Sequence, residues 1–283
     1  MFKTVPTSVL AFDMEWVPDP ATGRVVYDLP DDSSDDQVRE VMWQEGGATE
    51  EDPRPYLKTT LCQVVSVAFV LRRVAGDGAV RLDLQSLPQS SDTPASEKDI
   101  LDRFLGGIGK LQPKPQLVGY NSGTSDLPIL LQRGVATGVR APAFASRPDK
   151  PWEGLDYFVR FGEGHVDLID VLGNRGRGSP RLHELAVASG IPGKMGTDGR
   201  DVIELWISGE ARRIVQYNEY DALTTYLLWL RTAHFAGHFS SSQYEEEQQL
   251  VRDLLNTKME DPDYDHLKDY LDKWEWLSKL REG

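Results

Sequence analysis

The sequence SVLAFDMEW at residues 8–16 brings two carboxylates to the end of an apolar run. The run predicts a short buried strand that ends on Asp13. Alternate side chains of a strand project from one face, so Asp13 and Glu15 point the same way. Neighbouring carboxylates repel each other unless a cation neutralises them, and hard oxygen ligands suit Mg²⁺ or Mn²⁺. The tripeptide D-x-E is common, however, and acids that end a strand at solvent are its simpler interpretation when it stands alone.

The rest of the chain predicts an α/β fold. Strands are expected where apolar and β-branched residues form short runs, at Leu61–Arg72, Val80–Leu84 and Gln116–Tyr120. Helical spacing of apolar residues predicts helices at Ser96–Gly106, Asp126–Gly134, His165–Leu172, Arg181–Ser189, Arg200–Ser208 and Ala211–Ala233. Strands that come first and are followed mostly by helices indicate a central sheet flanked by helices.

Two segments flank this pattern. Residues 17–58 are polar, acidic and contain several prolines, which predicts a long insertion with one short helix near Asp36–Trp43 and partial disorder. Residues 243–281 predict two helical stretches broken at the sequence DPDYD. We therefore divide the chain into a domain of residues 1–240, which includes the insertion, and a helical extension of residues 241–283.

Composition limits the classes of protein to consider. The chain has 283 residues, a formal net charge of −14 and a single cysteine, Cys62, so it has neither an internal disulfide framework nor a multi-cysteine zinc site. Acidic residues concentrate at the two ends, whereas residues 61–240 are neutral, which leaves room for a nucleic-acid site that binds cations. The sequence contains no apolar run of membrane-spanning length and no signal-peptide layout. These features favour a cytoplasmic protein with no membrane partner.

Two further motifs carry acids. An apolar strand and a small polar turn precede Asp126, at the start of a helix whose first turn holds Pro128. Helix capping is the favoured interpretation of an aspartate in that place when it is taken alone. In the sequence YNEYDALTTYLLWLR, Tyr217 and Asp221 are four residues apart, so they lie on one face of a helix. A core tyrosine beside a surface aspartate is the ordinary interpretation of that pair.

The four acids and the tyrosine together form one ordered pattern. In this pattern the chain resembles the DEDD exonuclease superfamily, in the tyrosine subgroup that includes the proofreading domains of family-B DNA polymerases. In particular it is similar to stand-alone bacterial proteins described as predicted 3′→5′ exonucleases related to those domains. The resemblance covers roughly residues 8–235 apart from the insertion, and it also rests on GYN, DLPIL, HVDLIDVL and LHELAVASGIPGKMGTDGRDV. The chain departs from the family in its longer insertion and in Ser125, where an aromatic residue is usual.

The resemblance implies a ribonuclease H-like mixed sheet and a two-metal hydrolysis of single-stranded DNA, from the 3′ end, to nucleoside 5′-monophosphates. It assigns Asp13 as the ligand shared by two divalent cations, Mg²⁺ or Mn²⁺. Glu15 and Asp221 would complete the first metal site, and Asp126 would hold the second cation. Tyr217 would orient the attacking water, since a phenol with a pKa near 10 is a poor general base at neutral pH.

Substrate contacts are less specified by the sequence. Lys194 is a candidate for a backbone phosphate, with a solvated loop residue as an equal alternative, and Arg175, Arg177 and Arg181 are weaker candidates. Asn121 would bind either its own turn or a nucleotide. Trp16 would pack in the core or meet a base, and the core is favoured.

The expected partner is the 3′ end of a single-stranded nucleic acid, with DNA favoured over RNA. The same site would also serve a 3′→5′ exoribonuclease or oligonucleotide-degrading enzyme, because sugar selectivity depends on contacts at the 2′ position. A non-catalytic nucleic-acid-binding module of the same fold is a third interpretation, which the complete set of acids disfavours. A zinc hydrolase is excluded by the lack of clustered histidine and cysteine.

Overall fold

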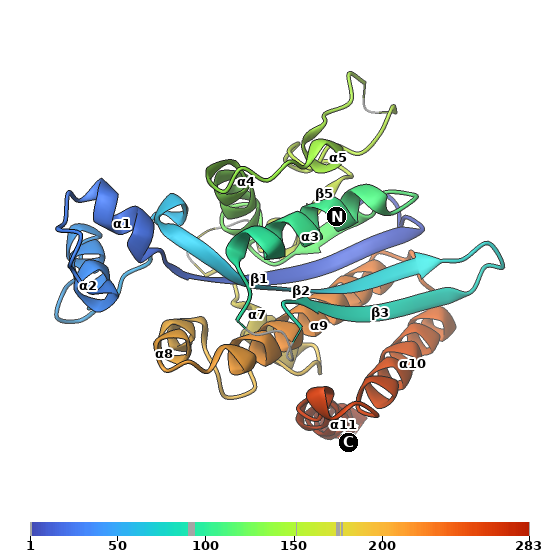
Figure 1. Ribbon diagram of the computed structural model, residues 1–283. Coiled ribbons are helices and arrows are strands. Elements are labelled where there is room, and N and C mark those ends of the chain that lie inside the picture. The colour runs from blue at the N-terminus through green and yellow to red at the C-terminus, as the bar shows by residue number, and fades with distance from the viewer. Residues whose placement is uncertain (1, 90–93, 151, 174–175, 177, 283) are drawn as a thin grey trace.

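A computed structural model describes residues 2–89, 94–150, 152–173, 176 and 178–282. At its centre lies a five-stranded sheet with the order β3-β2-β1-β4-β5 (Figure 1). The strands are β1 Ser8–Pro18, β2 Cys62–Val74, β3 Val80–Leu87, β4 Gln116–Gly119 and β5 His165–Asp167. Strands β1, β2 and β3 pair antiparallel, whereas β4 and β5 run parallel to β1. This mixed sheet flanked by helices confirms the predicted fold class.

The helices are α1 Pro20–Val26, α2 Asp35–Glu45, α3 Glu97–Lys110, α4 Asp126–Ala136, α5 Pro142–Ala145, α6 Leu168–Leu172, α7 Leu182–Ala188, α8 Val202–Ile207, α9 Ala211–Phe235, α10 Ser241–Lys258 and α11 Leu267–Glu282. Short 3₁₀ turns are η1 Thr59–Leu61, η3 Gly199–Asp201 and η4 Pro262–Tyr264. Helices α3 and α4 lie on one side of the sheet, and α9, α10 and α11 lie on the other (Figure 1). Among the described residues, no helix is both long and apolar enough to cross a bilayer.

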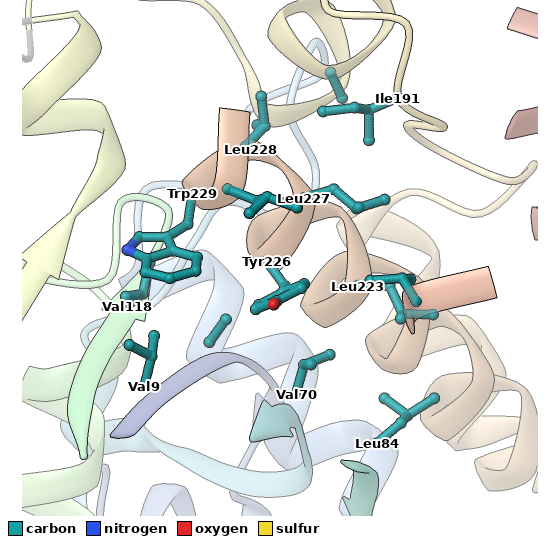
Figure 2. Packing of buried hydrophobic residues seen from close by; sticks show 14 of the residues in the cluster. Val9, Val70, Leu84, Val118, Ile191, Leu223, Tyr226, Leu227, Leu228 and Trp229 are labelled. Carbon is teal, nitrogen blue, oxygen red and sulfur yellow. The ribbon is translucent and has the colours of Figure 1, made fainter. Parts of the chain in front are cut away.

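Side chains along β1 alternate between the two faces of the sheet, so this strand packs against the helices on both sides. Val9 and Ala11 pack in the cluster on the α9 side, while Leu10 and Phe12 pack in the cluster on the α3 side. Figure 2 shows Val9 and its sheet neighbours facing Tyr226 and Trp229 of α9. Asp13 and Glu15 have the same parity as Val9 and Ala11, so the strand turns both carboxylates toward α9.

Two predicted elements differ from the structure. Strand β1 does not end on Asp13 but continues to Pro18, with a register shift after Glu15, because the long β2 pairs with it over its whole length. The sequence HVDLIDVL was expected to be helical throughout. Its first three residues instead form β5, which pairs with β4, and α6 begins only at Leu168. Pairing with a buried parallel strand outweighs the helical spacing there.

The insertion is folded, so the expected partial disorder is wrong. The predicted helix is present as α2, whose start is capped by Ser34, and α1 precedes it. Val38 and Met42 of α2 pack with Leu61 in a small cluster of their own. The insertion thus forms a compact lobe at the end of β1 and β2 (Figure 1).

The C-terminal helices pack on the α9 side of the core. Arg72 on β2 donates to Glu247 on α10 from its Nε to Oε2 over 2.8 Å, and both side chains are buried. Such a pair costs desolvation and is destabilising when one partner is removed. The two predicted helices and the break between them are confirmed, and the division into a domain and an extension at residue 240 stays a prediction.

Candidate active site

Three carboxylates from two elements meet at one point. Asp13 and Glu15 come from β1 and Asp221 comes from α9, and one oxygen of each lies within 4.8 Å of the oxygens of the other two. The parity of β1 aims its two acids at α9, which crosses the sheet beside them. The sequence-predicted convergence of these three residues is therefore present in the geometry.

Asp126 reaches the same place from the turn after β4. Ala11 on β1 pairs with Val118 on β4, so Asp13 lies level with the point where the chain leaves β4 and enters that turn. The buried Asp126 carboxylate accepts a hydrogen bond from the Met14 backbone. It also accepts a 2.7 Å hydrogen bond from the Ser125 hydroxyl. The Ser125 side chain thus serves as a donor to the acid.

Burial and mutual repulsion raise the pKa values of the carboxyl groups in this cluster. Burial, then the charges of Asp221 and Asp126, hold the pKa of Asp13 and of Glu15 well above the ordinary range. Burial raises the pKa of Asp126 to about 7, against the effect of the Ser125 hydrogen bond. Burial raises the pKa of Asp221 to about 6, against a hydrogen bond from Tyr217 and the charge of Lys194. A bound divalent cation relieves this repulsion, so the donor set fits a metal centre.

Tyr217 lies one helical turn before Asp221 and is 6% exposed. Burial, followed by the nearby carboxylates, raises its pKa far above the ordinary value. The phenol therefore stays protonated at any physiological pH, and its hydroxyl donates to Asp221. Tyr220, the residue before Asp221, points away from this site, and its hydroxyl donates to the His266 carbonyl over 2.8 Å.

The acids line a cleft of about 460 Å³ whose other wall comes from the insertion. We call residues 51–57, of sequence EDPRPYL, the strap. Tyr56 and Arg54 of the strap border the cleft together with Trp43 from α2. The sequence alone does not single out these residues, because an acidic, proline-bearing segment resembles a solvated loop. An aromatic residue among acids and prolines, such as Tyr56, is the signal that would have pointed to them.

The three predicted substrate contacts fall in different places. Trp16 borders the cleft while part of its side chain packs against the core on the α3 side. Lys194 forms an ion pair with Asp198. Asn121 lies in the turn after β4 with φ of 61°, and its side-chain oxygen accepts from the Thr124 hydroxyl over 2.7 Å, which is the turn-stabilising alternative.

The weaker candidates and the cysteine are also placed. Arg175 and Arg177 lie outside the described residues. The backbone N–H of Arg181 donates to Glu184 over 2.8 Å at the start of α7. Burial raises the pKa of Cys62 to about 12, so its thiol is unreactive at neutral pH.

A protein family matches this chain over residues 54–274, and its description is predicted 3'-5' exonuclease related to the exonuclease domain of PolB. The chain belongs to this family. It is therefore an enzyme of the predicted 3′→5′ exonuclease class, and the match includes Asp126, Tyr217 and Asp221. Asp13 and Glu15 precede the matched residues, and the geometry described above brings them to Asp221.

The exonuclease is also similar to the family B DNA polymerase from the hyperthermophilic archaeon Pyrobaculum calidifontis, with 19% sequence identity and a TM-score of 0.45. That similarity covers 78% of this chain and 24% of the polymerase chain, so the exonuclease spans about a quarter of that polymerase. No curated protein matches the chain.

Proposed function

We propose that this protein is a metal-dependent 3′→5′ exonuclease that hydrolyses single-stranded DNA and releases nucleoside 5′-monophosphates. The observation that carries the proposal is the convergence of Asp13, Glu15 and Asp221 within 4.8 Å, in a cleft that Asp126 and Tyr217 also line. These carboxylates are buried and repel one another, and a bound cation would stabilise their charge.

Two divalent cations, Mg²⁺ or Mn²⁺, fit the donor set. Asp13, Glu15 and Asp221 would hold the first, and Asp13 would be shared with a second cation held by Asp126. When bound, the cations neutralise the phosphate and lower the pKa of the attacking water. The Met14 amide and the Ser125 hydroxyl fix the Asp126 carboxylate from outside, which keeps this acid oriented toward the cleft.

Tyr217 would position the attacking water. Its hydroxyl stays protonated, so it orients a water through a hydrogen bond rather than removing its proton. Asp221 accepts from the same hydroxyl, which holds the phenol at a fixed distance from the acids.

DNA is the preferred substrate because the family description relates these proteins to the exonuclease domain of a DNA polymerase. Lys194 would contact the substrate backbone, since its positive charge lies close enough to Asp221 to lower the pKa of that carboxyl. An RNA strand of the same sequence tests this preference directly.

The test is Mn²⁺-dependent digestion of a 5′-labelled single strand by the wild type, Asp13→Ala and Asp102→Ala. Asp102 is an exposed acid on α3, so its variant controls for the loss of a negative charge. We expect the wild type and Asp102→Ala to shorten the strand from its 3′ end, and Asp13→Ala to lose this activity while keeping its circular dichroism spectrum. Equal activity of Asp13→Ala and wild type would contradict the proposal. Matched DNA and RNA strands then rank the two substrates.

A further inference from the structure

The strap is held in place by α8 and by the rest of the insertion. Arg54 pairs with Glu204 on α8, and its guanidinium carbon lies 5.0 Å from the ring centroid of Trp43. Leu57 occupies the space that Gly46 leaves, since a methyl group on Gly46 would lie 2.6 Å from a Leu57 side-chain carbon. Pro53 and Pro55 restrict the backbone on both sides of Arg54. The strap therefore has a defined conformation before any ligand binds.

Tyr56 projects from this strap toward the acids. A methyl group placed on Gly199 would lie 3.7 Å from the Tyr56 hydroxyl oxygen and 3.9 Å from the Tyr217 hydroxyl oxygen. The two tyrosines thus approach the same small space from opposite walls, and Gly199 keeps that space open. Tyr56 is nevertheless 74% exposed, so its ring is not packed in the core of the protein.

The charges around Tyr56 determine which part of a nucleotide fits there. The charged side chains that border the cleft beside Tyr56 include the acids Glu51, Asp52 and Glu15. Arg54 and Arg200 border it as well, and Arg54 is paired with Glu204. The acids repel a phosphate that is not neutralised by a cation, whereas an exposed aromatic ring attracts a flat, uncharged base. A nucleobase is therefore the group that complements the exposed Tyr56 ring.

Resting on the proposed function, we propose that Tyr56 is a nucleobase-stacking residue of the active-site cleft. Its ring stacks on a base at or next to the 3′ end of the substrate, and the strap holds the ring in place for that contact. Stacking does not require a particular base, because every base has a π-face. A base that is paired in a duplex is already stacked between its neighbours, so this contact favours an unpaired 3′ end.

The first experiment measures digestion of a single strand by wild type, Tyr56→Ala, Tyr56→Phe and Phe235→Ala. Base–aromatic stacking predicts that Tyr56→Ala raises KM by about 5- to 100-fold with little change in kcat. Tyr56→Phe keeps the ring and should have a KM close to that of wild type. Phe235 is equally exposed, at 79%, but lies at the far end of α9, so Phe235→Ala should match wild type.

The second experiment repeats the kinetics on strands that carry an abasic site at the last or the second-last position. At the stacked position, loss of the base should lower kcat/KM of wild type by the same factor as Tyr56→Ala. It should have little further effect on Tyr56→Ala, since the contact is already absent. Equal KM values for Tyr56→Ala and wild type would overturn the inference. So would a Tyr56→Phe variant as poor as Tyr56→Ala, or an abasic effect that is the same in both proteins.

A binding measurement separates failure of this inference from failure of the proposed function. Fluorescence anisotropy of a labelled single strand reports affinity without cleavage, and it is recorded for wild type and Tyr56→Ala in Ca²⁺. A wild type that binds the strand but does not cleave it refutes the exonuclease proposal alone. A wild type that cleaves while Tyr56→Ala binds with equal affinity refutes the stacking inference alone.

Discussion

The two walls of the cleft are built in different ways. The acid wall consists of Asp13, Glu15, Asp126 and Asp221, and these residues lie on a strand and two helices that belong to the hydrophobic core. The strap wall is an irregular segment of a lobe that packs mainly against itself, with Arg54 as its link to α8. The acid wall is therefore fixed by the whole fold, and the strap wall by a few local contacts.

This difference is typical of sites in which the groups that carry out catalysis and the groups that bind the substrate lie on different structural elements. Groups that hold cations need a constant geometry, which regular elements over a packed core provide. Groups that contact a substrate tolerate more variation and are more often placed on loops. We therefore expect changes in the acid wall to affect turnover and metal response, and changes in the strap to affect KM alone.

The largest expected effect concerns the acid wall and pH. Folding raises the pKa of Asp221 to about 6 and of Asp126 to about 7, above their values in the unfolded chain. Their contribution to stability is thus fully present below the unfolded pKa and is lost as pH rises through 6 and 7. Thermal melts should show the metal-free protein losing stability between pH 5.5 and pH 8. Saturating Mn²⁺ should then raise Tm at pH 8 by on the order of 5 °C, and by less at pH 5.5.

Variants of the two walls sharpen this result. Asp13→Asn removes one charge from the cluster, so it should weaken the effect of Mn²⁺ on Tm and the loss of stability at high pH. Arg54→Ala changes only the strap and should retain both effects. An equal Mn²⁺ effect at both pH values would show that these carboxylates do not take up the cation.

The acid wall was predictable from the sequence because each of its parts depends on local geometry. Strand parity placed Asp13 and Glu15 together, and helical spacing placed Tyr217 above Asp221. Local geometry does not predict that separate segments meet in one site. The resemblance to a known family predicted that meeting. The length of β1 was underestimated, because polar residues after Phe12 are held in the strand by pairing with β2.

The strap wall was not predictable in the same way. Its residues border the cleft through contacts between distant segments, such as Arg54 with Glu204, which leave no periodic signal in the sequence. The ion pair of Lys194 with Asp198 joins residues four apart, but the loop conformation that brings them together has no regular spacing. Short elements such as β5 also escape prediction, since three residues carry too little pattern.

Tyr217→Phe is expected to have the next largest effect. The variant keeps the ring but loses the hydroxyl that we propose positions water, so kcat should fall by about 10- to 100-fold while KM changes little. Loss of the hydrogen bond to Asp221 should also move the acidic limb of the pH–rate profile to higher pH, because that bond lowers the pKa of Asp221. Tyr220→Phe is the matched control. It loses a hydrogen bond to His266 and about 1 kcal/mol of stability, but not activity.

Lys194→Ala tests the proposed contact between Lys194 and the substrate backbone. Removal of one phosphate contact should raise KM several-fold. It should also reduce the slope of the logarithm of the binding constant against the logarithm of the salt concentration by about one. Asp198→Asn breaks the ion pair without removing the lysine, so it should lower KM or leave it unchanged. Lys98→Ala, on an exposed position of α3, controls for net charge. A salt slope that is identical in wild type and Lys194→Ala would assign the lysine to the loop rather than to the substrate.

Arg54→Ala is expected to have the smallest effect, and it tests the comparison most directly. Both partners of the Arg54–Glu204 pair are substantially exposed, so its loss should lower the free energy of unfolding by about 1 kcal/mol or less. The strap would then be less ordered, and KM for an intact single strand should rise about two- to threefold, since part of the binding energy must order it again. Turnover at saturating substrate should be unchanged, because the acid wall does not depend on this pair. A fall in kcat without a change in KM would show that the two walls act as one unit.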